Sequence, residues 1–347
     1  MRWLSRLKEL SEAPGPPGWE DAVREIIKRE VEEEADKLYE DKLGNLIAVK
    51  KGGEGRVMLA AHMDEVALMA SYLEESGLIR FVSLGRVVPE QILAQRVVVH
   101  AKRELKGVVG VIPAHLADKR EKLELGDLYI DVGAGSRKEL EKLGVKPGSY
   151  ITFDTPLAYQ EETRSLMGKA LDNRVGCMVL AEAFKEASPG YKLYAVFTVQ
   201  EERGLRGAQP AAYHVKPDLA IAVDSTIAAD TPEIPKHKAV TRLGGGPALR
   251  VMDSRLITPR KLLDFMVKVA EEAGIRYQLQ LSPRSTTDAS AINLAREGVP
   301  AAAVATPVRY IHAPVSLAKA EDIEETMRYV SALLEALNTH PIARSGR

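Results

Sequence analysis

The feature that most constrains this chain of 347 residues is the alternation of apolar, strand-like runs with segments of helical periodicity. Strands that alternate with helices indicate a largely parallel sheet with helices on both of its faces. We therefore predict an α/β fold with a mixed, mostly parallel sheet flanked by helices. The most apolar of the predicted strands are Arg56–Ala61, Leu193–Val199, Leu219–Val223 and Ala301–Ala305.

Residues 68–156 interrupt this alternation. Short strand-like runs such as Arg96–His100 and Leu128–Asp131 follow one another there, with turn signals between them. Several short strands at close spacing favour a small β-barrel or sandwich. We predict that this β-rich domain is a small β-barrel inserted into a larger domain made of residues 1–67 and 157–347.

Charge and composition exclude some classes of protein. The formal net charge of -1 gives no overall field that favours nucleic acid or an anionic membrane. No uninterrupted apolar run approaches the ~18 residues of a membrane span, and the N-terminus lacks the apolar region of a signal peptide. We expect a cytoplasmic protein that binds neither nucleic acid nor membrane. The single cysteine, Cys177, lies in an apolar helical run and is interpreted as a small buried thiol.

Two adjacent glutamates, Glu201 and Glu202, follow directly on the strand Leu193–Val199. In open α/β sheets, ligands bind beyond the carboxyl ends of the strands, which is where this pair falls. Side chains alternate faces along a strand, so the two glutamates are expected to do different work. One of them could face a metal ion while the other faces a water held by that ion.

Further acidic and histidine residues stand at predicted strand or helix ends. Imidazole and carboxylate together suit zinc, cobalt or manganese. Two such ions need a bridging carboxylate and terminal ligands on each, and the residues present suffice for that with one acid left for proton transfer. Asp64 lies two residues after His62, where it could orient a ligating ring. The other candidates are Asp172, Asp224 and His312.

Each candidate also has a structural interpretation when it is taken alone. His62 could be a core histidine at the end of a buried strand, Asp172 could cap the helix that it precedes, and Asp224 could be a loop residue. Separate structural roles for all of these residues would require several independent coincidences, so one shared site is favoured. His100 and His115 are interpreted as structural residues.

Other chemistries lack their motifs. The sequence contains no G-x-S-x-G elbow, no phosphate-binding G-x-x-x-x-G-K-[ST], no G-x-G-x-x-G and no H-E-x-x-H. Its basic residues are scattered among acids, which argues against nucleic-acid binding. A cellulose-cleaving site would use two carboxylates without metals, and the histidines would have no purpose there.

Five short motifs follow one another along the chain: His62-x-Asp64-Glu65, Ala170-Leu-Asp172-Asn-Arg, Gln200-Glu201-Glu202-x-Gly204, Val223-Asp224 and Tyr310-Ile-His312. In this order they resemble those of the tetrahedral aminopeptidases, a family of dinuclear-metal peptidases. Some members carry the name glutamyl aminopeptidase, and others endoglucanase. Further likeness near the N-terminus extends the resemblance over essentially the whole chain.

The resemblance implies a zinc-peptidase-like fold and two divalent metal ions per subunit, either zinc or cobalt. It pairs His62 with Asp224 on one ion and His312 with Glu202 on the other, with Asp172 as the bridge. It makes Glu201 the general base and Asp64 the support for His62.

The resemblance also concerns the backbone and the assembly. It implies a cis peptide bond between Asp172 and Asn173. It implies that the inserted β-domain is a dimerisation domain, in homo-oligomers whose dimers assemble into a dodecamer.

The resemblance implies hydrolysis of N-terminal residues from peptides with a free N-terminus. Two alternatives stay open. A metal-dependent deacylase or carboxypeptidase would keep the metals and act on a different end of the substrate. A catalytically silent peptide-binding assembly protein would keep the scaffold alone, but such a protein would be expected to have lost at least one ligand or the base.

Overall fold

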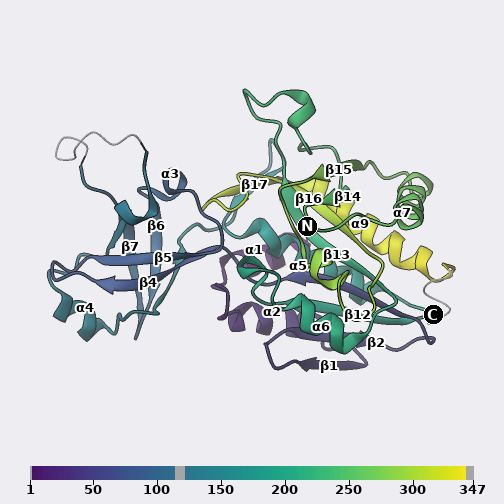
Figure 1. Ribbon diagram of the computed structural model, residues 1–347, viewed down its shortest axis with the longest axis horizontal. Helices are drawn as coiled ribbons and strands as arrows, with labels where there is room; N and C mark the ends of the chain where they lie inside the picture. Colours follow the sequence, from purple (N-terminus) through teal and green to yellow (C-terminus); the bar gives the residue numbers. More distant parts are fainter. Residues whose placement is uncertain (1, 114–121, 341–347) are drawn as a thin grey trace.

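The computed structural model describes residues 2–113 and 122–340 and divides them into a large α/β part and a smaller β-barrel (Figure 1). His115 lies outside the described residues. The longer helices all belong to the α/β part, and α3 and α4 belong to the barrel. The helices are α1 (Arg2–Glu12), α2 (Asp21–Val31), α3 (Pro89–Ile92), α4 (Arg137–Leu143), α5 (Leu171–Glu186), α6 (Ala208–Val215), α7 (Arg260–Glu272), α8 (Asp288–Ile292) and α9 (Ala320–Leu337).

The described part of the chain forms a mixed sheet of eleven strands and a closed barrel of six. The sheet strands are β1 (Lys37–Glu40), β2 (Leu46–Lys50), β3 (Arg56–His62), β10 (Ala158–Gln160), β11 (Ser165–Gly168), β12 (Lys192–Thr198), β13 (Leu219–Ile227), β14 (Ala248–Asp253), β15 (Gln278–Ser282), β16 (Ala301–Arg309) and β17 (Ser316–Lys319). The barrel strands are β4 (Ala67–Leu73), β5 (Ile79–Leu84), β6 (Arg96–His100), β7 (Glu104–Gly110), β8 (Tyr129–Asp131) and β9 (Tyr150–Phe153).

The centre of the sheet is parallel. Strands β12, β3, β13 and β16 lie side by side in that order and pair in parallel, so their carboxyl ends meet at one edge. The flanking strands are antiparallel: β2 pairs with β12, and β17 pairs with β16. The predicted α/β fold with a mixed sheet, flanking helices and an inserted β-barrel is confirmed. The sheet is parallel at its centre, but six of the ten strand pairs among its described strands are antiparallel.

Residues of the central strands alternate between two apolar cores. Leu59 and Ala61 of β3 face a core built with α1, α2, α5, α7 and α9, whereas Met58 and Ala60 face a smaller core built with α6 and α8. Both faces of β3 are buried, which explains why its sequence is an apolar run without a polar alternation. Cys177 of α5 is buried in the larger core, where burial raises its pKa to about 12, so the predicted buried thiol is confirmed.

The barrel closes in the order β4-β5-β8-β7-β6-β9 around its own apolar core. Among the short strands of this domain, the sequence predicted β6 and β8 but gave no strand at β4. No helix among residues 2–113 and 122–340 is both long and apolar enough to cross a membrane.

Candidate metal centre

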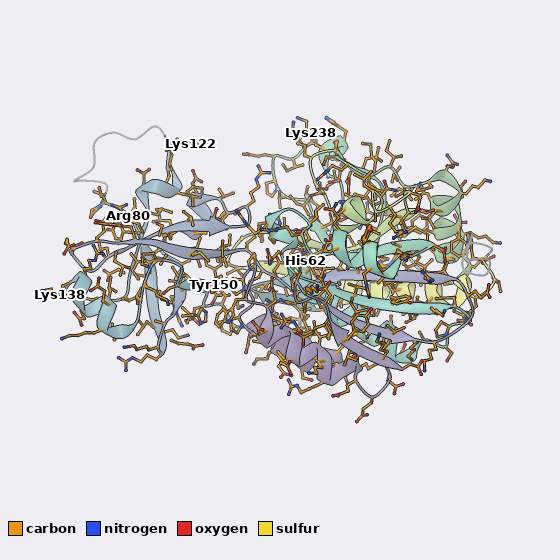
Figure 2. All side chains as sticks on the ribbon, turned by 60° about the horizontal axis from the view of Figure 1, so that its bottom comes forward. His62, Arg80, Lys122, Lys138, Tyr150 and Lys238 are labelled. Carbon is orange, nitrogen blue, oxygen red and sulfur yellow. The ribbon has the colours of Figure 1, made fainter. Side chains whose placement is uncertain are left out.

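The side chains that the sequence singled out come together at the carboxyl ends of the parallel strands. Figure 2 shows His62, the last residue of β3, inside the α/β part and away from the labelled side chains of the barrel. The other side chains come from β13, from the turns after β12 and β16, and from the start of α5. They are Asp224, Glu201, Glu202, His312 and Asp172.

Two three-residue groups share the carboxylate of Asp172. In the first group, Nε2 of His62 lies 3.3 Å from Oδ1 of Asp172 and 3.6 Å from Oδ1 of Asp224. In the second, Nε2 of His312 lies 3.2 Å from Oδ2 of Asp172 and 3.3 Å from Oε1 of Glu202. Within each group, the candidate ligand atoms lie within 4.8 Å of one another. The two oxygens of Asp172 therefore face two different imidazoles.

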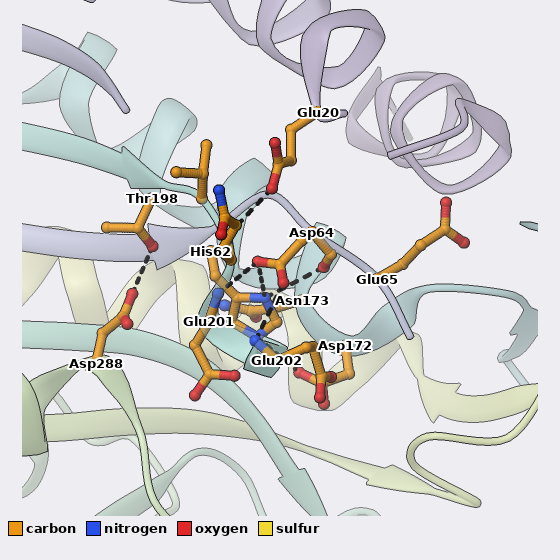
Figure 3. Close-up of polar contacts among 12 residues, drawn as sticks. Glu20, His62, Asp64, Glu65, Asp172, Asn173, Thr198, Glu201, Glu202 and Asp288 are labelled. Carbon is orange, nitrogen blue, oxygen red and sulfur yellow. Dashed lines mark hydrogen bonds and ion pairs between the residues drawn. The ribbon is translucent and has the colours of Figure 1, made fainter. Parts of the chain in front are cut away.

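Asp64 connects His62 to the turn that carries the two glutamates (Figure 3). Its carboxylate oxygens accept hydrogen bonds from the backbone N–H groups of Glu201 (2.9 Å) and Glu202 (3.0 Å). Nδ1 of His62 lies 3.2 Å from the backbone oxygen of Asp64 and 3.5 Å from its Oδ1. Asp64 is fully buried, so both the ring and the turn are held from inside the protein.

The prediction that strand alternation separates Glu201 from Glu202 was wrong. Strand β12 ends at Thr198, and Gln200 takes a left-handed backbone conformation with φ of 55°. Glu201–Arg203 then form a single 3₁₀ turn, in which successive side chains diverge by about 120°. The Glu202 carboxylate faces His312, whereas Figure 3 shows the Glu201 carboxylate apart from the Asp172 and Glu202 side chains.

The backbone at Asp172 departs from a regular helix start. The peptide bond between Asp172 and Asn173 is cis, as the resemblance implied. The side chain of Asn173 donates to the carbonyl of Val223 (2.9 Å) and accepts from the N–H of Gly176 (3.0 Å). These bonds tie the start of α5 to β13, one residue before Asp224.

Burial and mutual contact shift the pKa values of the site. Burial lowers the pKa of His62, but its contacts with Asp172, Asp224 and Asp64 outweigh this and hold that pKa well above its usual value. His312 behaves in the same way: burial opposes the charged form, yet Glu202 and Asp172 raise its pKa to about 9. At neutral pH the metal-free chain therefore carries two protonated imidazoles against Asp172.

Burial also raises the pKa values of three carboxylates of the site, including that of Glu202, which faces His312. Burial raises the pKa of Glu201 well above its usual value, despite the opposing charge of His62. Burial also raises the pKa values of Glu202 and Asp288 to about 7. This site holds more buried negative charge than its histidines balance.

The residues present fit bound cations. Oδ1 of Asp172 is buried and makes no hydrogen bond within the described part of the chain, even though Nε2 of His62 lies 3.3 Å away, whereas buried polar atoms normally make one. The donor set combines imidazole nitrogens with carboxylate oxygens, as divalent zinc or cobalt prefers. An excess of buried carboxylates is unfavourable unless cations balance it.

The sequence missed the position of Asp288 in the site. Asp288 is the first residue of α8. Its buried carboxylate also accepts a hydrogen bond from the hydroxyl of Thr198, at the end of β12, and one of its oxygens has no partner. A threonine is common in strands, so no sequence signal pointed to this contact.

Comparison with known proteins agrees with this geometry. Residues 44–329 match the family described as M42 glutamyl aminopeptidase. Lysyl aminopeptidase of Pyrococcus furiosus is 38% identical over 339 residues, which cover 95% of this chain and 96% of that protein.

Two solved structures show the same likeness. TET aminopeptidase from the marine sediment archaeon Thaumarchaeota archaeon SCGC AB-539-E09 has a TM-score of 0.95 at 36% identity and covers 98% of both chains. The TET1 peptidase of Pyrococcus horikoshii, described as assembling into a tetrahedron or a large octahedral shell, has a TM-score of 0.84. It is 33% identical and covers 96% of this chain and 99% of that chain. The likeness thus covers both the α/β part and the barrel.

Proposed function

Because this chain belongs to the M42 glutamyl aminopeptidase family and is therefore a peptidase, we propose that it is a dinuclear-metal aminopeptidase. It removes N-terminal residues from peptides. The observation that carries this proposal is the pair of ligand groups that share Asp172. A single carboxylate facing two imidazoles is the arrangement that a two-ion site requires.

We propose five ligands for two divalent cations, zinc or cobalt. His62 and Asp224 would hold one cation, His312 and Glu202 would hold the other, and Asp172, whose two oxygens face both imidazoles, would be shared between them. Asp64 keeps the His62 ring in place through its contacts with Nδ1. Removal of such a supporting partner typically costs 10–100-fold in metal affinity or activity, by order of magnitude.

Glu201 is the proposed general base. Bound cations supply Lewis acidity, which activates a water and polarises the scissile carbonyl. Glu201 accepts a proton from the attacking water and delivers it to the leaving amine, general acid–base work worth ~10²–10⁴-fold. Its raised pKa in the buried site suits a group that must both take and return a proton.

The charge of the site supports action on an amino end and argues against a carboxypeptidase. Glu201, Glu202 and Asp288 are three acidic side chains at the same strand ends, and burial raises the pKa of each. Such surroundings favour a positively charged substrate group and disfavour a free carboxylate. We therefore place the free N-terminus of the peptide against these carboxylates.

We also propose that the protein is a cytoplasmic homo-oligomer. The description of the Pyrococcus horikoshii relative names a tetrahedron or a large octahedral shell, and the barrel is present in full among the described strands. In this proposal, residues 68–156 form the dimerisation domain, residues 1–67 and 157–347 form the catalytic domain, and dimers assemble into a dodecamer. Light scattering on the purified protein tests the assembly.

The test of the function is turnover on a panel of aminoacyl p-nitroanilides, each with and without an N-acetyl block. The protein is stripped with a chelator and reloaded with zinc or cobalt, and bound metal is counted. We expect metal-dependent release from the unblocked substrates alone. Cleavage of the blocked substrates would instead indicate a deacylase or an endopeptidase. Absence of turnover with metal bound would indicate a silent peptide-binding protein.

A further inference from the structure

The turn that carries Glu201 is held by side chains from three other segments. Four successive backbone N–H groups, from Val199 to Glu202, each donate to a side-chain oxygen. The N–H of Val199 donates to Oδ1 of Asn45 (2.9 Å), and that of Gln200 donates to Oε1 of Glu20 (3.1 Å). The next two donate to Asp64, as described above.

These acceptors are buried and fixed by other contacts. Glu20 is 2% exposed and Asn45 is fully buried. Oε1 of Glu20 also accepts the N–H of Gly18 (2.8 Å), just before α2. The amide nitrogen of Asn45 donates to Asp41 (2.6 Å) and to the carbonyl of Gly207 (2.9 Å). Both side chains therefore approach the turn from rigid positions.

The local backbone explains why the turn needs such acceptors. Gln200 has a φ of 55°, a conformation that residues other than glycine adopt rarely and keep when their surroundings fix it. The first N–H groups of a helical turn have no partner within the turn. Here side-chain oxygens accept all of them, so the direction in which the chain leaves β12 is fixed residue by residue.

We propose that Glu20 and Asn45 are positioning residues for Glu201. They hold the backbone at Val199 and Gln200, so that the Glu201 carboxylate lies where it can take a proton from the attacking water. This inference rests on the proposed function. Neither residue was singled out in the sequence, because Glu20 lies 181 positions before the base and Asn45 lies 156 positions before it.

Two conservative variants separate the reach of Glu20, meaning a side chain long enough to accept the N–H of Gln200, from its charge. Glu20→Gln keeps the length and an oxygen acceptor but loses the charge. Glu20→Asp keeps the charge, but its side chain is one methylene too short to reach the N–H of Gln200. Asn45→Ala removes the neighbouring acceptor. Glu12→Ala is the matched control, because Glu12 also accepts a single backbone N–H, that of Leu157 (3.0 Å), away from the turn.

Two readouts are needed. The first is hydrogen–deuterium exchange of peptides that contain residues 199–203, measured on the metal-free protein. The second is kcat and KM on unblocked aminoacyl p-nitroanilides after metal loading, with bound metal counted. A misplaced catalytic group loses rate, while a uniform loss of binding would raise KM.

In Glu20→Asp and Asn45→Ala, we expect the backbone amides of the turn to exchange faster and kcat to fall by about 10- to 100-fold. KM and metal content stay near the wild-type values, and Glu20→Gln recovers most of the rate. Glu12→Ala behaves like the wild type in both readouts.

Other results would overturn the inference. Wild-type protection and kcat in both Glu20→Asp and Asn45→Ala would show that the turn needs neither acceptor. Loss in Glu20→Gln together with wild-type behaviour in Glu20→Asp would show that the charge of Glu20, rather than its reach, matters. If the wild type cleaves no unblocked substrate, the proposed function fails, while the exchange data alone still decide whether Glu20 and Asn45 order the turn.

Discussion

Two buried clusters of charged side chains lie next to each other along the chain and balance their charge differently. The paired cluster consists of Glu65, Lys169 and Arg174. The acidic cluster consists of the proposed ligands together with Glu201 and Asp288. Their members alternate in sequence, because Glu65 follows His62 by three residues and Asp172 lies between Lys169 and Arg174.

In the paired cluster one carboxylate faces two cations, and groups of the protein supply most of the contacts, although Nε of Arg174 has no hydrogen-bond partner among the described residues. Both oxygens of Glu65 lie 2.7 Å from Nζ of Lys169, and Oε1 lies 3.3 Å from Nη2 of Arg174. Lys169 also donates to the carbonyl of Ala13 (3.0 Å), as does Arg174 (3.1 Å). The cluster thus fixes the N-terminal segment against both sides of Asp172.

The acidic cluster has no such internal balance. Its two imidazoles both face Asp172, and one oxygen of Asp172 still has no hydrogen-bond partner. Burial raises the pKa values of Glu201, Glu202 and Asp288, which means that their charges lack sufficient partners. The comparison teaches that two buried clusters a few residues apart can have opposite purposes: one closes the fold, and the other requires cations from solution.

The prediction with the largest expected effect concerns Glu201, the proposed general base, which is not one of the proposed metal ligands. Glu201→Gln removes the proposed base without removing a ligand. We expect turnover to fall by ~10²–10⁴-fold with two metal ions still bound. Steady-state kinetics on an unblocked aminoacyl p-nitroanilide and a metal count check this.

The neighbouring glutamate provides the control for that prediction. Glu202→Gln changes a proposed ligand and is expected to lower the metal content, because its carboxylate is the one that faces His312 (3.3 Å). Full turnover in Glu201→Gln would remove Glu201 from the mechanism, and unchanged metal content in Glu202→Gln would remove Glu202 from the ligand set.

The second prediction concerns the paired cluster. Glu65→Gln leaves Lys169 and Arg174 buried without their anion, and breaking such a buried pair costs about 3–5 kcal/mol of unfolding free energy. Denaturant titration of the chelator-treated protein measures this loss. The control is Glu25→Gln, since the exposed Glu25 lies 3.8 Å from Lys28 and such surface pairs contribute about 1 kcal/mol or less. Equal losses in the two variants would contradict the distinction between the clusters.

The sequence predicted the components of this site better than their geometry. Alternation of apolar strands and helices indicated the sheet, and the carboxyl ends of its parallel strands indicated where acidic and histidine residues would meet. The structure brings His62, Asp172, Glu202, Asp224 and His312 into two adjoining groups, as the resemblance implied. Their role as ligands stays a prediction.

Contacts over long sequence distances could not be predicted. Glu20 and Asn45 reach the turn after β12 through hydrogen bonds to backbone N–H groups, which leave no pattern in a single sequence. The strand was predicted to end at Val199, one residue beyond its observed end at Thr198, but the 3₁₀ turn that carries Glu201 was missed. Short strands such as β4 and β17 were missed, since runs of a few residues carry little periodicity.

The third prediction is that metal uptake depends steeply on pH. Contacts with carboxylates hold the pKa of His62 well above its usual value and raise that of His312 to about 9, so both rings are protonated at pH 7 in the metal-free chain. A cation binds the neutral ring and must displace these protons. Each bound zinc displaces the proton of one ring, so the affinity of each site is expected to rise about tenfold from pH 6 to pH 7, and the product of the two affinities about 100-fold.

Calorimetric titration with zinc, in two buffers of different ionisation enthalpy, counts the released protons. Glu25→Gln changes an exposed carboxylate outside both clusters, so it serves as a neutral control and should release the same number of protons as the wild type. An affinity for zinc that stays constant between pH 6 and pH 8 would show that the rings are already neutral, and the acidic cluster would then be less unbalanced than its geometry indicates.

The prediction with the smallest expected effect tests whether the excess negative charge of the acidic cluster influences Glu20. Burial and the charge of Asp64 raise the pKa of Glu20 to about 7. Between about pH 4.5 and pH 7, the unfolded chain ionises this group while the folded chain keeps it protonated, so stability falls as pH rises. Glu20→Gln keeps the acceptor for Gln200 and lacks this penalty. We expect the variant to match the wild type near pH 4.5 and to exceed it by about 1–3 kcal/mol above pH 7.

Thermal and denaturant unfolding of the chelator-treated protein at several pH values measures this difference. Zinc loading sharpens the result, because cations in the acidic cluster offset the charge of Asp64 and should reduce the gain in Glu20→Gln. A gain that is the same at all pH values would mean that Glu20 ionises normally. A gain unaffected by zinc would mean that burial alone, and not the unbalanced acidic cluster, holds the proton on Glu20.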